Sequence, residues 1–330
     1  MSHVSGVGRR STIAAAAAGL IGMPRIARGT AFPERPIRLV IPYGGGGQTD
    51  IVSRVTAEAL SHRLGQPVVA DNRPGGAGNL AAEIVARAPA DGYTVLVATA
   101  GTYSGLNALL YRAVGYDWAR DFAPVGMFCT TANMLIVHRS IPGRNFGEVV
   151  EWIRRNPGRF SFASAGVGAT THLIMEEVGE RLGLEMLHVP YRQTGQAMAD
   201  LLAGRVHSRC LGIPEAETLR QESSVRPVAV TTPARRPEWP DVATMGETIP
   251  GYESSSYFGL VVPVRTPPEV VARLNAALQE ALRDEGVRAA YRRAGADPAD
   301  PHPPETFAAR AAADGERWAP LIRRLNLVAE

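Results

Sequence analysis

The segment PYGGGGQTD, Pro42–Asp50, determines how the start of the chain folds. It follows Ile37–Ile41, an apolar run before a proline that is typical of a buried strand. It precedes Ile51–Leu64, in which apolar residues recur at helical spacing, and Thr49 and Asp50 are suitable N-cap residues for that helix. The sequence therefore predicts a strand, a glycine loop and a helix N-terminus. Such a loop turns backbone N–H groups and the positive end of a helix dipole towards an anion.

The beginning of the chain has the pattern of an export signal. Arg9 and Arg10 precede Ile13–Met23, a run of small and apolar residues that is too short to span a bilayer. Small residues at positions 29–31 suit a signal peptidase, which predicts a signal peptide over residues 1–31 and a mature start near Phe32. The arginine pair fits either a Sec or a twin-arginine signal, so the route stays open. The expected location is the periplasm.

The charge of the mature chain is balanced. Without the four arginines of the predicted signal, 31 basic residues face 32 acidic ones, and every basic residue is an arginine. These charges are dispersed, so no nucleic-acid partner is expected. Cys129 and Cys210 remain after cleavage, and an exported chain could pair them or bury them as free thiols. Neither cysteine has metal-ligand spacing, and no metal or cofactor is expected.

A second segment repeats the pattern of the first. SAGVGATT, Ser164–Thr171, lies between a strand predicted at Phe160–Ala163 and a helix predicted at about Thr171–Leu182. Strands and helices alternate from the first loop onward, which indicates parallel βαβ units in a doubly wound α/β domain. Phe122–His138 is read as two strands joined by a bend, where the chain crosses between domains, and Tyr257–Val262 as the return crossing. Two anion-receptive loops on two domains can face each other across a cleft.

The usual catalytic patterns are not present in the sequence. Thr49 stands where a GxGxxG fingerprint needs glycine, and no Gly-Lys-Ser/Thr follows for a Walker A loop, which disfavours a nucleotide enzyme. Ser164 has no G-x-S-x-G setting, and His172 has no partner for a catalytic triad, so this histidine shapes the loop or caps the helix. Asp50 caps its helix or holds a ligand ammonium. A plain turn without a ligand is the alternative for each glycine loop.

Several motifs together resemble the Bug family, the extracytoplasmic solute-binding proteins of tripartite tricarboxylate transporters. The resemblance covers nearly the whole mature chain in order. The segments that carry it are FPERPIR (Phe32–Arg38), LGQPVVADNRPGGAGN (Leu64–Asn79), ADGYTVLVATAGT (Ala90–Thr102), SFASAGVGATTHL (Ser161–Leu173), HVPYRQTGQAMADLLAGRV (His188–Val206) and YFGLVVPVRTPPEVVARLN (Tyr257–Asn275).

The resemblance implies an α/β, two-lobed periplasmic-binding-protein-like fold (Venus flytrap, type II), in which each lobe is a mixed sheet flanked by helices. It implies a first lobe over residues 32–131 plus 253–330 and a second lobe over residues 132–252. The implied function is capture of a small carboxylate in the cleft and delivery to the membrane permease subunits of a tripartite tricarboxylate transporter, by a monomer without catalysis. A ligand sensor for a signalling partner and an exported enzyme acting on a carboxylated substrate are the alternatives.

Carried over by position, the resemblance assigns ligand contacts to both loops and their flanks. These residues are Tyr43, Gly46, Gly47, Gln48, Thr49, Thr102, Ala165, Gly166, Gly168, Thr170 and Tyr191. Gly44, Gly45 and Gln48 depart from the typical Pro-Phe-Pro-x-Gly-Gly-Gly-Thr-Asp, which predicts a more flexible loop and a side-chain contact from Gln48. Cys210-Leu211-Gly212 stands where family members often carry Phe-Asp-Asn, and where that acid recognises a ligand amine this chain cannot do the same. A purely carboxylic ligand, aromatic or hydroxylated, is therefore expected.

Overall fold

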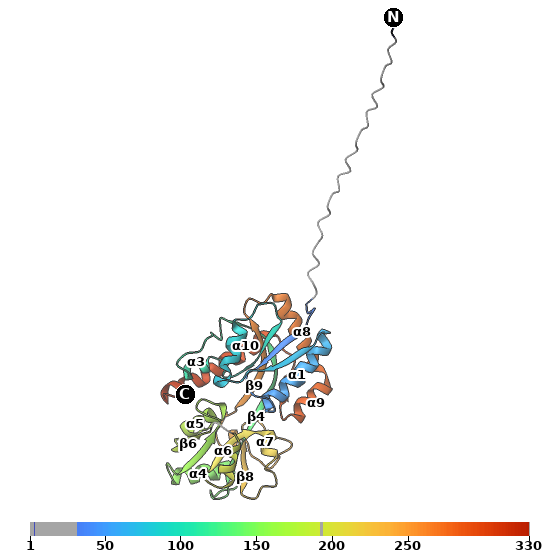
Figure 1. Ribbon diagram of the computed structural model, residues 1–330. Coiled ribbons are helices and arrows are strands. Elements are labelled where there is room, and N and C mark those ends of the chain that lie inside the picture. The colour runs from blue at the N-terminus through green and yellow to red at the C-terminus, as the bar shows by residue number, and fades with distance from the viewer. Residues whose placement is uncertain (1–2, 4–31, 192–193, 330) are drawn as a thin grey trace. The chain divides into compact units, whose positions relative to one another are not determined.

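The computed structural model of the protein describes His3, residues 32–191 and residues 194–329. The predicted signal peptide, apart from His3, lies outside the described residues. Residues from Phe32 onward form one compact unit. Its elements (Figure 1) are β1 (Ile37–Ile41), α1 (Gln48–Leu64), β2 (Val68–Asn72), η1 (Gly76–Gly78), α2 (Asn79–Ala86), β3 (Thr94–Thr99), α3 (Leu106–Leu110), β4 (Phe122–His138), α4 (Phe146–Arg155), β5 (Phe160–Ser164), α5 (Thr170–Leu182), β6 (Met186–Pro190), α6 (Thr194–Leu202), β7 (Ser208–Gly212), α7 (Ile213–Glu217), β8 (Val225–Val230), η2 (Met245–Glu247), β9 (Ser255–Pro263), α8 (Pro268–Arg283), α9 (Glu285–Arg293), β10 (Asp297–Pro298) and α10 (Pro304–Arg324).

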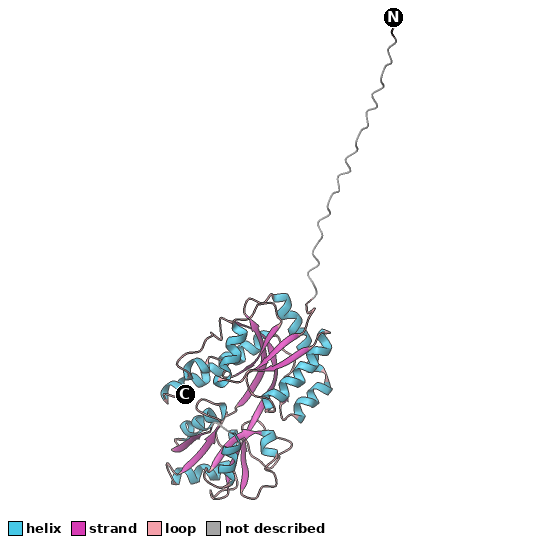
Figure 2. Cartoon of the chain, in the orientation of Figure 1, coloured by secondary structure: helices cyan, strands magenta, loops and turns pink. Residues whose placement is uncertain are grey.

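The strands form two sheet regions that share β4. In the first region the order is β2-β1-β3-β9-β4, with β1, β2 and β3 parallel and β9 antiparallel to both neighbours. In the second the order is β4-β7-β5-β6, with β5, β6 and β7 parallel and β4 antiparallel to β7 and β8. Helices pack on the sheets (Figure 2). We call the two regions with their helices the first and the second lobe. The predicted α/β class with a mixed sheet in each lobe is confirmed.

Strand β4 corrects one prediction. Phe122–His138 is a single strand, whereas its polar residues suggested two strands and a bend. Its first part pairs with β9 and its last part with β7 and β8, so the strand passes from one sheet region into the other. Thr131 and Asn133 remain in register with Ser256 and Gly212. Backbone pairing does not depend on side-chain polarity. The register between β4 and β9 is irregular in places, and these irregularities let β4 bend locally without a break.

The apolar cores lie on both faces of each sheet region. In the first lobe one core joins α1, α8 and α9 to the sheet, and the other joins α2 and α10. In the second lobe one core surrounds Phe160 and Phe162, and the other lies under α6 and α7. The core around Phe162 also contains Leu110 of α3 and Leu321 of α10. The two lobes thus share apolar contacts on the side of α3 and α10.

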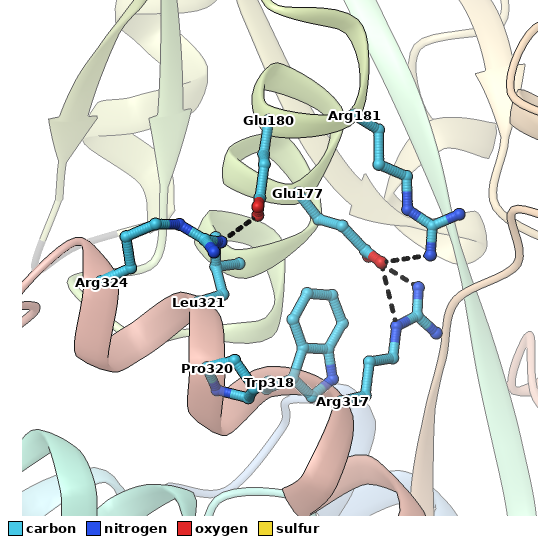
Figure 3. A pocket seen from close by; sticks show the side chains of 8 residues that line it. All are labelled: Glu177, Glu180, Arg181, Arg317, Trp318, Pro320, Leu321 and Arg324. Carbon is cyan, nitrogen blue, oxygen red and sulfur yellow. Dashed lines mark hydrogen bonds and ion pairs between the residues drawn. The ribbon is translucent and has the colours of Figure 1, made fainter.

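Ion pairs also join α5 of the second lobe to α10 (Figure 3). Glu177, which is 7% exposed, accepts hydrogen bonds of 2.7 Å from Arg181 of its own helix and from Arg317 of α10. Arg317 also donates to the Glu253 carbonyl at 2.7 Å. A second pair joins Glu180 to the α10 residue Arg324. Helix α5, whose first turn follows the second glycine loop, is therefore fastened to the C-terminal helix.

Both cysteines are free, buried thiols in the structure. Cys129 lies in a core of the first lobe and Cys210 in a core of the second. Burial raises the pKa of both thiols, and that of Cys210 reaches about 12. Within residues 32–191 and 194–329, no helix combines the length and the hydrophobicity needed to cross a bilayer.

Candidate functional site

The first glycine loop joins β1 to α1. Helix α1 begins at Gln48, and its N-cap is Gly47, with extended backbone angles (φ −80°, ψ 169°). The prediction that Thr49 and Asp50 cap this helix is therefore wrong. Because glycine itself takes the N-cap position, Asp50 falls in the first helical turn and reaches back into the loop. Its carboxylate accepts a hydrogen bond of 2.9 Å from the Gly46 N–H.

Asp50 is the buried anchor of this loop. The residue is 5% exposed; Arg54 Nε donates to both carboxylate oxygens at 3.0 Å, and Asn72 Nδ2 donates at 2.9 Å. Asn72 Nδ2 also donates to the Tyr43 carbonyl at 2.9 Å. Burial alone would raise the pKa of Asp50, but hydrogen bonds from Arg54, Gly46 and Asn72 and the charge of Arg54 lower it to about 2. The carboxylate is satisfied inside the loop, so it organises the loop instead of offering a free charge to an ammonium.

The start of α1 presents free backbone donors. Gly47 is exposed, and Gln48 and Thr49 are partly exposed. Among the described residues, the N–H groups of these three residues donate to no other protein atom. They lie at the positive end of a helix of 17 residues. The arrangement suits an anionic oxygen.

Two side chains of this loop contact neighbouring elements. Gln48 Nε2 donates to the Gly295 carbonyl at 3.3 Å, and a Cβ added to Gly212, at the end of β7, would lie 3.3 Å from Gln48 Oε1. Tyr43 is 37% exposed as a residue. Desolvation raises the pKa of Tyr43; a hydrogen bond with Thr99 opposes this rise. Tyr43 is therefore a neutral hydrogen-bonding group at neutral pH.

The two flanking residues assigned from the sequence are directed into their own lobes. Thr102 is fully buried, and its Oγ1 accepts a hydrogen bond of 3.0 Å from the Thr99 N–H. The Tyr191 hydroxyl donates to Asp200 at 2.9 Å, and the Tyr191 N–H donates to the Ser164 carbonyl at 3.1 Å. Thr102 closes the turn after β3, and Tyr191 supports the base of the second loop.

The second loop uses most of its own N–H groups. Ala165 N–H donates to Thr171 Oγ1 at 3.3 Å, Gly166 N–H to Ser164 Oγ at 3.1 Å, and Gly168 N–H to His172 Nδ1 at 3.0 Å. Gly166 and Gly168 have φ angles of +118° and +76°, which favour glycine. Three of the residues assigned to the ligand from the sequence thus form the internal frame of the loop.

The free donors of the second loop lie beside these residues. Helix α5 begins at Thr170 after the N-cap Ala169, and no side chain caps it. In the part of the chain that the structure describes, the N–H groups of Val167, Thr170 and Thr171 donate to no other protein atom. Sequence reasoning named Thr170 and missed Val167 and Thr171. Locating the helix start at Thr170 would have identified Thr171, because the first N–H groups of a helix have no partner within it.

Both loops lie where the two lobes meet. Gln48 of the first loop lies against Gly212 of the second lobe, as described above. A Cβ added to Gly168 would lie 2.2 Å from Leu110 Cδ1, so this glycine packs directly on α3 of the first lobe. The contact leaves no room for a side chain at position 168. Each loop thus contacts the other lobe, the first at the end of β7 and the second at α3.

Two histidine side chains hold the second loop in place through hydrogen bonds. His172, 1% exposed, shapes the loop as the sequence suggested, since its Nδ1 accepts from Gly168. Sequence reasoning missed His188 of β6, whose Nε2 lies 2.6 Å from Ser164 Oγ. The parallel register of β5 and β6, which opposes Phe162 to His188, creates this contact.

Comparisons with known proteins agree with this architecture. Residues 52–327 match the family model described as "Tripartite tricarboxylate transporter family receptor". The "UPF0065 protein in tcbD-tcbE intergenic region" of Pseudomonas sp. (strain P51) is 35% identical over 327 residues, which are 98% of this chain and 96% of the relative. "Protein BugT" of Bordetella pertussis is 30% identical over 293 residues, which are 88% of this chain and 90% of the relative.

Solved structures share the fold. "R. palustris Rpa4515 with adipate" is 35% identical, with a TM-score of 0.79 over 88% of this chain and 97% of that one. "MatC (Rpa3494) from Rhodopseudomonas palustris with bound malate" is 30% identical, with a TM-score of 0.75 over 88% of this chain and 100% of that one. Fold and loops thus define a two-lobed solute-binding protein of the periplasmic-binding-protein class. More specifically, the chain belongs to the family of tripartite tricarboxylate transporter receptors, to which the Bug proteins also belong.

Proposed function

We propose that this protein binds a small carboxylate between its two glycine loops and delivers it to the membrane subunits of a tripartite tricarboxylate-type transporter. The proposal includes export to the periplasm, action as a monomer, and the lobe boundaries expected from the sequence, residues 32–131 plus 253–330 and residues 132–252. One observation carries it. The N-termini of α1 and α5 both reach the junction of the lobes, and their first N–H groups donate to no other described atom.

The proposed ligand contacts are the backbone N–H groups of the two loops that donate to no other described atom. Gly47, Gln48 and Thr49 would donate from the first lobe, and Val167, Thr170 and Thr171 from the second. Tyr43 would add its hydroxyl group. Gly46, Ala165, Gly166 and Gly168 would shape the loops, and Thr102 and Tyr191 would support them.

Amide donors of this kind supply enough affinity for a transport receptor. A hydrogen bond to a charged oxygen contributes roughly 1.5–3 kcal/mol, and a partly buried helix N-terminus adds up to about 2 kcal/mol. A few such bonds, less the cost of ordering, correspond to micromolar binding or better. The ligand would favour the closed arrangement of the lobes, which the membrane subunits then recognise. Two relatives are described with adipate and with malate, so dicarboxylates are the first ligands to test.

The first experiment is a thermal-shift screen of the mature chain from Phe32 against mono-, di- and tricarboxylates and amino acids. We expect at least one dicarboxylate to raise the unfolding midpoint in a concentration-dependent way, with no consumption of the acid. Calorimetry would then give the dissociation constant and one ligand per chain. A broad panel without any shift would refute the proposal, and turnover of the acid would favour an enzyme.

A pair of proline variants tests the free N–H groups directly. Gln48 and Thr170 are the first residues of their helices, where proline is tolerated and removes only an N–H donor and the native side chain. The preceding residues are extended, as a residue before proline must be. We expect Gln48→Pro and Thr170→Pro to weaken binding about tenfold or more by calorimetry. Gln48→Ala and Thr170→Ala keep the N–H and serve as matched controls with a smaller loss. Equal affinities in the proline and alanine variants would exclude these donors.

A further inference from the structure

The imidazole rings of His172 and His188 stack on each other behind the second loop. Their centroids are 3.7 Å apart and their planes differ by 13°. The ring of Phe162 lies beside both, 5.0 Å from His188 and 6.2 Å from His172. Helix α5 contributes one histidine and strand β6 the other. The pair therefore joins two elements of the second lobe at the point where the loop turns.

Each ring is bonded to a different part of the loop. His172 Nδ1 accepts from the Gly168 N–H at 3.0 Å, so its proton is carried by Nε2, which lies 3.2 Å from Glu176 Oε1. His188 Nε2 lies 2.6 Å from Ser164 Oγ, and the same oxygen accepts from the Gly166 N–H at 3.1 Å. The two rings thus fix the N–H groups of both loop glycines, one directly and one through Ser164.

We propose that His172 and His188 are positioning residues that hold the Ser164–Thr171 loop in its anion-receptive form while the stacked rings are neutral, and that a proton taken up by His188 loosens the loop. This inference rests on the proposed carboxylate site. A proton on His188 would give both ring nitrogens an N–H, so Nε2 could no longer accept a hydrogen bond from Ser164 Oγ. A charge on either ring would also lie in a buried stack beside the other ring, where it is poorly solvated.

The charges around the pair set the direction of the pH dependence. Burial and the neighbouring His172 lower the pKa of His188 to about 4, and Glu176 opposes this shift. The neighbours from β5, Phe162 and Ser164, carry no charge. A released loop would return His188 to its ordinary pKa of about 6.5. The held loop is therefore fully populated above about pH 6.5, and it is lost progressively as the pH falls from there through about 4.

The test compares variants that keep or remove the acceptor atom. Asparagine places an oxygen near the position of Nδ1 and does not titrate, whereas leucine removes the acceptor. We expect His172→Leu to weaken binding of adipate or of another dicarboxylate that the wild type binds, about tenfold at pH 7.5. We expect His172→Asn to bind nearly as well as the wild type at pH 7.5, and His188→Gln, whose amide can reach Ser164 Oγ without titrating, to lose less affinity than the wild type between pH 7.5 and pH 4.5. Calorimetry across this pH range measures both effects.

His207 provides a matched control in the same lobe. Its Nδ1 accepts from the Ser161 N–H at 3.0 Å and its ring stacks on Phe160 at 6.0 Å, at the other end of β5. We expect His207→Leu to lower stability without changing the affinity or its pH profile. Unchanged affinity in His172→Leu, or an acid loss in His188→Gln equal to that of the wild type, would overturn the inference.

Hydrogen exchange separates this inference from the proposed function, because it needs no ligand. We expect the amides of residues 164–171 to exchange faster in His172→Leu than in the wild type, and no such change in His207→Leu. If the wild type binds no carboxylate but the loop exchange follows this pattern, the proposed function fails and the positioning role stands. Equal exchange in the wild type and in His172→Leu would refute the positioning role itself.

Discussion

The two glycine loops share one plan but are held by opposite chemistry. In the first loop a single ionised carboxylate, Asp50, gathers the Gly46 N–H, Asn72 and Arg54. In the second loop neutral groups, a serine hydroxyl and two imidazoles, gather the loop amides. The first loop leaves its glycines exposed, whereas the second packs Gly168 on α3. The order strand, glycine loop, helix therefore does not determine which side chains hold the loop in place.

This difference shows how an anion site tolerates a buried acid. Asp50 would repel a bound carboxylate, but Arg54 balances its charge and its oxygens are already occupied by hydrogen bonds. The attraction for the ligand is then left to the backbone N–H groups of both loops. The two anchors also differ in acid resistance, since the carboxylate remains ionised to about pH 2, whereas the His188 imidazole, with a pKa of about 4, becomes protonated at a higher pH. Acid should therefore loosen the second loop first.

Removing the carboxylate should have the largest effect on stability. Asp50→Ala leaves the Gly46 N–H, Asn72 and the Arg54 guanidinium without their shared partner, which is the one buried group among them. We expect the free energy of unfolding to fall by about 3 kcal/mol at pH 7 in urea titrations. Asp50 has a lowered pKa when folded, so its contribution is complete above its ordinary pKa of about 3.9 and is lost as the pH falls through about 2. The difference between the variant and the wild type should shrink over that range.

Asp71→Ala is the matched control for this comparison. Asp71 lies in the same lobe and pairs with Arg38 and Arg73, but its side chain is 24% exposed and holds no loop amide. We expect a loss below about 1 kcal/mol, as for ordinary surface ion pairs. An equal loss in the two variants would mean that the first loop is not organised by a special anchor.

The order of elements could be predicted because hydrophobic periodicity and glycine turns are local signals. The helix start at Gln48 could not, since Thr49 and Asp50 favour both the N-cap and the first helical turn. The continuity of β4 was missed because Thr131 and Asn133 are polar, whereas a strand is maintained by its backbone partners. These partners come from distant segments that a local pattern does not include.

Both glycine loops named from the sequence reach the lobe junction, and their role in binding a ligand stays a prediction. Which N–H groups remain free depends on side chains brought by tertiary contacts. Asn72 lies 22 residues beyond Asp50, and His188 lies 24 residues beyond Ser164. The sequence contains no local signal for either pairing. A register between parallel strands is needed before such contacts can be inferred.

Alanine at the loop glycines tests the packing difference, with a smaller expected effect. Gly168→Ala adds a Cβ that would lie 2.2 Å from Leu110 at a φ of +76°, so it pays for both strain and overpacking. We expect a loss of about 2 kcal/mol in urea titrations and weaker ligand binding. Gly46→Ala in the first loop and Gly166→Ala also have positive φ but meet no atom within 4 Å. These two controls should lose only about 1 kcal/mol; equal losses at all three positions would show that contact with α3 does not constrain the second loop.

The smallest expected effect concerns the ion pairs that join α5, the helix after the second loop, to α10. Glu177→Gln keeps the shape of the side chain but removes the charge that bridges Arg181 of α5 and Arg317 of α10. Because Glu177 is buried, whereas the side chains of Arg181 and Arg317 are 39% and 26% exposed, we expect a loss of about 1 kcal/mol in the free energy of unfolding.

The Glu180–Arg324 pair between the same helices supplies the control. Its side chains are 43% and 54% exposed, so Glu180→Gln should change stability by less than Glu177→Gln. We also expect Glu177→Gln to raise hydrogen exchange in residues 164–171 and to leave residues 42–50 unchanged, since only the second loop leads into α5. Exchange that rises equally in both loops would show that the Glu177 bridge stabilises the whole junction of the lobes, and the two loops would then share this support despite their different anchors.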